Sequence, residues 1–168
     1  HQLIMRELAA LTPDIPVLSE EAADIPWTVR QQWQRYWLVD PLDGTKEFIK
    51  RNGEFTVNIA LIEAGEPVLG VIHAPVLGKT YSGGLGLGAF VADERGERAI
   101  QALAPQAGET VRLVGSKSHY QPEVEPYLAQ FPQHELVAVG SSLKICLVAE
   151  GAAHIYPRFG PTTLWHTG

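Results

Sequence analysis

Apolar residues recur along the chain with the spacings of both helices and strands. Positions at helical spacing predict a helix over 3–11, which Thr12-Pro13-Asp14 ends. The same spacing predicts helices at 123–131 and 143–150, the second of them stopped by Gly151. Short apolar runs between turn residues predict strands at 15–18, 36–39, 55–62, 68–73, 80–82, 89–92, 111–115 and 136–140.

The order of these elements predicts an α+β chain with two parts. Strands follow one another up to about residue 100, which indicates an antiparallel sheet, and strands then alternate with helices. A change of composition at 105–109 places the boundary, so we expect an antiparallel-sheet domain at 1–108 and a partial second α/β domain at 109–168. The glycine-rich run 83–88 invites a phosphate-loop interpretation, but it lacks the following Lys-Ser/Thr, and a tight hairpin is favoured.

Composition narrows the class of protein without identifying it. The 168 residues are 45% hydrophobic, enough to bury one core, and no run of 18 apolar residues predicts a membrane span. The net charge of −6 argues against general nucleic-acid binding. The single cysteine, Cys146, excludes an intrachain disulfide and fits a reducing cytoplasm, and its apolar helical setting predicts a small buried side chain.

The first candidate functional residues follow the strand at 36–39, starting with Asp40. Pro41 cannot donate to a sheet ladder, so we expect the strand to end there in a turn completed by Asp43-Gly44. Two carboxylates three residues apart repel each other unless a cation lies between them, and Mg²⁺ is bound by one or two carboxylates plus a substrate phosphate. The alternative is a turn in which Asp40 and Asp43 only cap backbone N–H groups.

A second acidic pair shifts the balance toward a metal-assisted phosphate site. Glu20-Glu21 follows the apolar segment 15–18, so two short strands deliver carboxylates from their C-terminal ends. That arrangement is typical of a site at the edge of a sheet.

These motifs resemble the inositol monophosphatase superfamily of Mg²⁺-dependent, lithium-sensitive phosphomonoesterases. The resemblance is carried by Leu18-Ser19-Glu20-Glu21 and by Trp37-Leu-Val-Asp-Pro-Leu-Asp-Gly-Thr45. The continuation through 46–60, together with 140–144 and 156–161, is similar to the bacterial 3′(2′),5′-bisphosphate nucleotidase branch. The resemblance implies a layered α/β/α/β sandwich, incomplete here, and removal of the 3′-phosphate from adenosine 3′,5′-bisphosphate.

The resemblance also implies roles for individual residues. Glu20 and Asp40, with the carbonyl of Leu42, would hold a first Mg²⁺, and Asp40 and Asp43 a second. The phosphate would be cradled by N–H groups of Gly44 and Thr45, and Thr45 would orient the attacking water. An ordinary N-cap at Thr45 is the alternative, and it is compatible with that role.

Substrate-facing positions are implied further along the chain. They are His119, Ser141, Ser142, Lys144 and Arg158, matched to groups that face the nucleotide and its second phosphate. Arginine can grip a phosphate through two N–H groups. The alternative for Lys144 and Arg158 is that they are solvated surface charges. His73 and His154, in strand-like apolar settings, are expected to be packed or surface groups.

Two departures from the family pattern bear on activity. The family closes its second metal site with an aspartate where this chain has His166, and an imidazole suits Zn²⁺ better than Mg²⁺. Family members also have elements before and after the matched region. We therefore expect a fragment or a shortened copy, with a weakened second metal site.

The sequence leaves three hypotheses open. The first is the Mg²⁺-dependent nucleotidase with a small nucleotide substrate, in the cytoplasm or peripheral to the inner membrane. An inositol or sugar phosphatase is disfavoured by Lys46-Glu47-Phe48, since the inositol branch usually has Thr-Asn-Phe there. A non-catalytic metal- or nucleotide-binding module is the third hypothesis.

Overall fold

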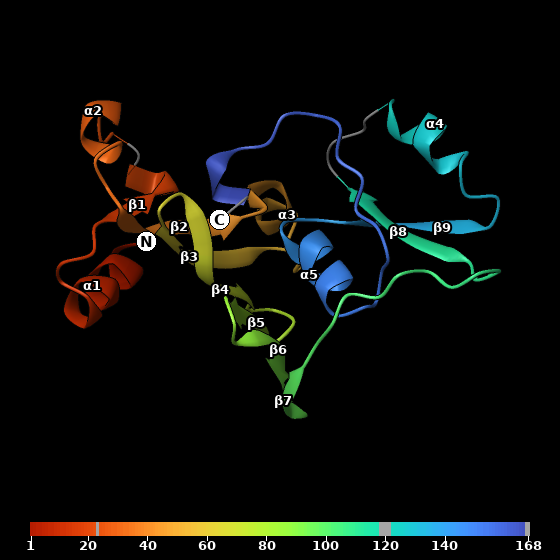
Figure 1. Ribbon diagram of the computed structural model, residues 1–168, viewed down its shortest axis with the longest axis horizontal. Coiled ribbons are helices and arrows are strands. Elements are labelled where there is room, and N and C mark those ends of the chain that lie inside the picture. Colours follow the sequence, from red (N-terminus) through yellow and green to blue (C-terminus); the bar gives the residue numbers. More distant parts are fainter. Residues whose placement is uncertain (23, 118–121, 167–168) are drawn as a thin grey trace.

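The structure is a computed structural model that describes residues 1–22, 24–117 and 122–166, and it has an α+β fold (Figure 1). A seven-stranded sheet has its strands in sequence order, and a two-stranded parallel sheet pairs β8 with β9. The strands are β1 (Val17–Ser19), β2 (Arg35–Asp43), β3 (Thr56–Glu63), β4 (Glu66–Ala74), β5 (Lys79–Gly84), β6 (Gly88–Asp93), β7 (Gly96–Ala99), β8 (Val111–Ser116) and β9 (His134–Val139). The helices are α1 (Gln2–Leu11), η1 (Glu20–Ala22), α2 (Trp27–Arg30), α3 (Thr45–Ile49), α4 (Val124–Leu128), α5 (Leu143–Ala149) and η2 (Leu164–His166).

The larger sheet is mixed rather than purely antiparallel. β1 pairs parallel to β2, whereas every other neighbouring pair is antiparallel. The parallel pairing brings the C-terminal ends of β1 and β2 to the same edge of the sheet, which is the arrangement the acidic pairs predicted.

The expected strand end at Asp40 is wrong. β2 continues to Asp43, and its pairing with β3 shifts register between Asp40, opposite Asn58, and Asp43, opposite Thr56. Two residues of β2 therefore stand where β3 has one, which is a β-bulge. Pro41 lies in the bulge, where its missing N–H interrupts no ladder hydrogen bond.

Other elements match the sequence expectations more closely. The glycine-rich run forms the hairpin between β5 and β6, with Gly84 paired to Gly88. The helix expected at 123–131 is shorter, since α4 ends at Leu128. The sequence did not predict α2 or β7, both only four residues long.

Helix α5 connects the two parts of the chain. It follows β9 in sequence, yet its Leu143 and Cys146 pack against Ala74, Tyr81 and Val91 of the larger sheet. Figure 1 shows α5 between that sheet and the β8–β9 pair. An element of the expected second part thus contributes to the core of the expected first part. The division at residue 108 remains a prediction.

Two further cores hold the ends of the molecule. Leu18 and Leu38 pack with Ala60 of β3, and Trp165 of η2 covers this cluster. Leu113 of β8 packs against Leu128 of α4. Among the described residues, no helix is long and apolar enough to cross a membrane.

Candidate metal and phosphate site

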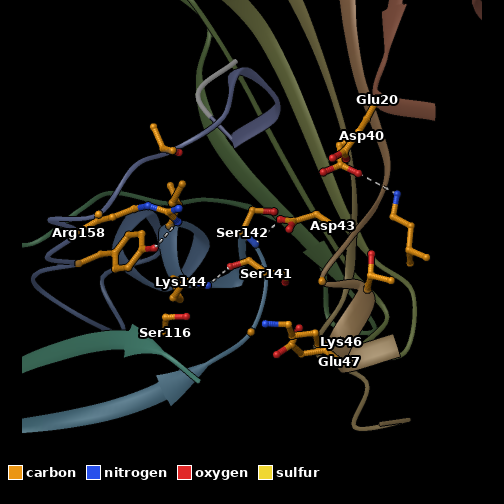
Figure 2. Close-up of a pocket in the computed structure, with 18 residues that line it drawn as sticks. Glu20, Asp40, Asp43, Lys46, Glu47, Ser116, Ser141, Ser142, Lys144 and Arg158 are labelled. Carbon is orange, nitrogen blue, oxygen red and sulfur yellow. Dashed lines mark hydrogen bonds between the residues drawn. The ribbon is translucent and has the colours of Figure 1, made fainter. Parts of the chain in front are cut away.

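A cleft of about 540 Å³ lies between the β2–α3 segment and the segments that begin α5 and follow it. Its lining comes from parts of the chain more than one hundred residues apart: Glu20, Asp40, Leu42, Asp43, Gly44, Thr45, Lys46, Glu47, Ser116, Gly140, Ser141, Ser142, Lys144, Ile145, Tyr156, Arg158, Gly160 and Thr162. Figure 2 shows Glu20, Asp40 and Asp43 on one wall, with Lys144 and Arg158 across from them. The cleft therefore has an acidic wall and a basic wall.

Glu20 and Asp40 are neighbours because of the parallel strand pairing. Ser19 pairs with Val39, so the next residue of each chain segment is a carboxylate at the same sheet edge. Asp40 is only 2% exposed, and its Oδ1 accepts a hydrogen bond of 3.0 Å from the Leu42 N–H. Burial, together with the charges of Glu20 and Asp43, raises the pKa of Asp40 to about 7, although the Leu42 hydrogen bond acts in the opposite direction. Asp40 therefore ionises less readily than a carboxyl group in water, and a cation beside it would favour the ionised form.

Asp43 is buried at the end of β2 and is held by hydrogen bonds. Its Oδ2 accepts the Ser142 N–H at 2.6 Å and the Asn58 side-chain N–H at 3.3 Å. Among the described residues, no three side chains of Asp, Glu, His and Cys stand close enough to hold one ion together. The donors in this wall are oxygens, which fits Mg²⁺, since that ion keeps several waters and needs only one or two carboxylates plus a phosphate.

The segment after Asp43 begins helix α3. Gly44, with φ of 92°, occupies the N-cap position, and Thr45 is the first residue of the helix. The alternative of an N-cap at Thr45 is therefore wrong. The left-handed backbone of the N-cap position suits glycine and disfavours threonine. Thr45 is exposed in the cleft, so its hydroxyl is accessible from solvent.

The basic wall is built on α5 and the segment that follows it. Lys144 is 7% exposed, its Nζ donates to the Ser141 carbonyl, and it lies 5.6 Å from the centre of the Tyr156 ring. Burial lowers the pKa of Lys144, whereas the charges of Asp43 and Glu47 act to raise it. Arg158 is exposed, and it donates to the Tyr156 hydroxyl at 3.3 Å and to the Pro161 carbonyl at 2.6 Å.

The structure brings the predicted site residues together in this cleft, with two exceptions. His119 lies outside the described residues, and so does the side chain of His166. The backbone of 164–166 forms η2, next to the cluster that contains Leu18 and Leu38. Ser142 contacts protein groups, since its Oγ lies 2.7 Å from Thr56 Oγ and 2.9 Å from Asn58 Oδ1.

Sequence reasoning missed several polar residues around the cleft. Asn58 was detectable, because it interrupts the apolar run of β3, and the structure places it opposite Asp40. Glu47 is 4% exposed and lines the cleft, but no local pattern distinguishes it from a surface residue of a short helix.

The mixed sheet, with carboxylates and basic side chains on opposite walls of one cleft, is the architecture of a class of α+β proteins. The chain belongs to the inositol monophosphatase family, whose model matches residues 1–167.

Individual relatives agree with this assignment. The chain is 56% identical over 168 residues to the 3′(2′),5′-bisphosphate nucleotidase CysQ of Escherichia coli K12, covering 99% of this chain and 66% of that protein. It is 40% identical to the CysQ of Haemophilus influenzae, with 99% and 62% covered. The chain thus spans less than two thirds of the length of these curated relatives.

Solved structures show the same similarity. The crystal structure of CysQ from Bacteroides thetaiotaomicron superimposes with a TM-score of 0.85 at 41% identity, covering 97% of this chain and 67% of that one. Mycobacterium tuberculosis SuhB superimposes with a TM-score of 0.78 at 25% identity, covering 98% and 65%.

Proposed function

We propose that the protein is a Mg²⁺-dependent phosphomonoesterase that converts adenosine 3′,5′-bisphosphate to AMP and phosphate. The observation that carries the proposal is that buried Asp40 and Asp43 face Lys144 and Arg158 across the same cleft. The carboxylates suit a divalent metal ion. The positively charged side chains of Lys144 and Arg158 suit a second phosphate of the same substrate. The named relatives are 3′(2′),5′-bisphosphate nucleotidases, which supports this substrate class. A cytoplasmic location remains a prediction from the sequence.

The proposed roles follow the geometry of the two walls. Glu20, Asp40 and the Leu42 carbonyl would hold one Mg²⁺, and Asp43 would contribute to a second. When bound, such a metal pair polarises the phosphate and makes a bound water more acidic. The N–H groups of Gly44 and Thr45 would donate hydrogen bonds to the phosphate oxygens. The Thr45 hydroxyl would form a hydrogen bond with the attacking water and so orient it.

The test is phosphate release from adenosine 3′,5′-bisphosphate and from inositol 1-phosphate, measured side by side with Mg²⁺ and with EDTA. Mg²⁺-dependent release from the nucleotide alone is the expected result. Release from inositol 1-phosphate alone would assign the chain to the inositol or sugar phosphatases. Binding of nucleotide without release from either substrate would identify a non-catalytic binding module.

Replacing Lys144 with methionine should weaken binding of the bisphosphate. A lost hydrogen bond to a charged group is worth about 1.5–3 kcal/mol, so the Kd should rise about tenfold or more. The Kd of adenosine 3′-monophosphate, which lacks the second phosphate, should change less. Isothermal titration in EDTA, where the bisphosphate is not hydrolysed, measures both Kd values, and Lys50→Met, at an exposed lysine just after α3, is the matched control. An equal loss for both nucleotides would contradict the role of Lys144.

Replacing His166 with aspartate should raise Mg²⁺ affinity or turnover. The change restores the negative charge that the family has at this position, and carboxylates suit Mg²⁺ better than imidazole does. A Mg²⁺ titration of phosphate release measures the effect. Unchanged half-saturation and unchanged turnover would show that His166 does not limit the second metal site.

A further inference from the structure

Glu54, which none of the roles above includes, joins the two parts of the chain beside the cleft. It lies between α3 and β3, and its Oε1 accepts a hydrogen bond of 2.9 Å from Lys117 Nζ. Its Oε2 accepts the Gly140 N–H at 2.9 Å. Lys117 follows β8 and Gly140 follows β9, so one carboxylate fixes the C-terminal ends of both parallel strands to the larger part of the molecule.

Residues 140–142, which Glu54 holds through the Gly140 N–H, pack closely against α3 and the turn before it. A Cβ added to Gly140 would lie 2.4 Å from Glu47 Cγ and 2.9 Å from the Glu54 carbonyl oxygen. A Cβ on Gly44 would lie 3.1 Å from Ser141 Cβ. Ser141 itself has a φ of 49°, a conformation that persists only where the surroundings enforce it.

This segment in turn orients Asp43. The Ser142 N–H, two residues after Gly140, donates its 2.6 Å hydrogen bond to Asp43 Oδ2. A continuous path of hydrogen bonds and backbone thus runs from the Glu54 carboxylate through 140–142 to a proposed metal ligand.

We propose that Glu54 is a positioning residue that holds 140–142 against Asp43 and so aligns the basic wall of the cleft with the acidic wall. Burial acts to raise the pKa of Glu54, but hydrogen bonds from Lys117 and Gly140 hold that pKa below its ordinary value, so the carboxylate is ionised at neutral pH. Both partners of Glu54 are hydrogen-bond donors, and an ionised carboxylate can accept from both.

The variant Glu54→Gln tests this path. The glutamine oxygen can accept only one of the two donors, and its amide N–H₂ group then faces the other donor. We expect amide hydrogen exchange at Gly140 and Ser142 to accelerate about tenfold, the equivalent of one lost charge-assisted hydrogen bond. Exchange at Leu113, in the core of β8, reports overall stability and should change much less.

The matched control is Glu63→Gln, which alters an exposed ion pair with Arg35 far along β2 and β3 from the cleft. It should leave exchange at Ser142 unchanged. Equal acceleration at Leu113 and Ser142 in Glu54→Gln would overturn the proposal, since Glu54 would then only stabilise the fold. Acceleration at Gly140 alone would also overturn it, since the effect would stop before Asp43.

The catalytic part of this inference rests on the proposed function, whereas the exchange measurement does not. If the chain releases phosphate, Glu54→Gln should lower kcat, because Asp43 loses its alignment, and should also raise KM, because Lys144 is bonded to the Ser141 carbonyl and shifts with 140–142. An unchanged kcat would overturn the positioning role. If the unaltered chain releases no phosphate, the proposed function fails, and exchange at Ser142 alone decides the role of Glu54.

Discussion

Asp40→Asn should abolish Mg²⁺-dependent phosphate release while making the metal-free protein more stable. Asparagine keeps an oxygen that can accept the Leu42 N–H but supplies no charge to a cation. Loss of a charged metal ligand should reduce turnover by at least about 100-fold, the upper end of the losses seen when even indirect partners of a metal are changed. Release at the unaltered rate would show that Asp40 holds no catalytic metal.

The stability change follows from the pKa of Asp40. Since the folded protein raises this pKa from 3.8 to about 7, the folded state binds the proton more tightly than the unfolded chain does. In EDTA, stability should therefore fall as pH rises from about 4 to about 7, and the full penalty should persist above pH 7. The difference corresponds to about 4 kcal/mol as an upper limit.

Thermal unfolding in EDTA at pH 8 and at pH 4 measures this effect. At pH 8, a gain of even 1 kcal/mol would raise the Tm of Asp40→Asn by about 2–4 °C for a chain of this size. At pH 4 the two proteins should differ little. At pH 8, added Mg²⁺ should stabilise only the unaltered protein. A variant less stable than the unaltered protein in EDTA at pH 8 would contradict the electrostatic account.

Gly140→Ala should destabilise the protein by about 1–3 kcal/mol, the usual range for inserting a methyl group into a packed site. The new Cβ would meet the buried side chain of Glu47 close to its backbone, at Cγ, and the carbonyl oxygen of Glu54. Relief requires α3 and 140–142 to separate, so phosphate binding should weaken together with stability.

The control for Gly140→Ala is Gly70→Ala in β4. Gly70 has open space where a Cβ would lie, so alanine should be neutral or slightly stabilising. Urea unfolding of the two variants measures the difference. Equal midpoints would mean that the close approach of Gly140 to α3 relaxes without strain.

The sequence predicted the main strands and the acidic wall because both depend on local patterns. Asp40, Asp43 and Gly44 stand within five residues, and apolar runs mark β2 and β3 on either side. The continuation of β2 through Pro41 was missed, since a bulge depends on the partner strand and not on the turn propensity of the residues.

The contacts between the two walls could not be predicted in this way. Ser142 reaches Asp43 across 99 positions of sequence, and Glu54 reaches Gly140 across 86. Such pairings depend on how the sheets pack together, and the periodicity of the sequence does not indicate that packing. Glu54 therefore looks like an ordinary charged residue in a loop until its partners are seen.

The burial of Cys146 makes it a built-in probe of α5. Its side chain is 2% exposed between α5 and the larger sheet, and burial raises the pKa of its thiol to about 12. Modification by a bulky thiol reagent should therefore be slow and should speed up when the helix lifts from the sheet. Since the sequence has no other cysteine, the labelling rate would report how often the helix that carries Lys144 opens, without an engineered label.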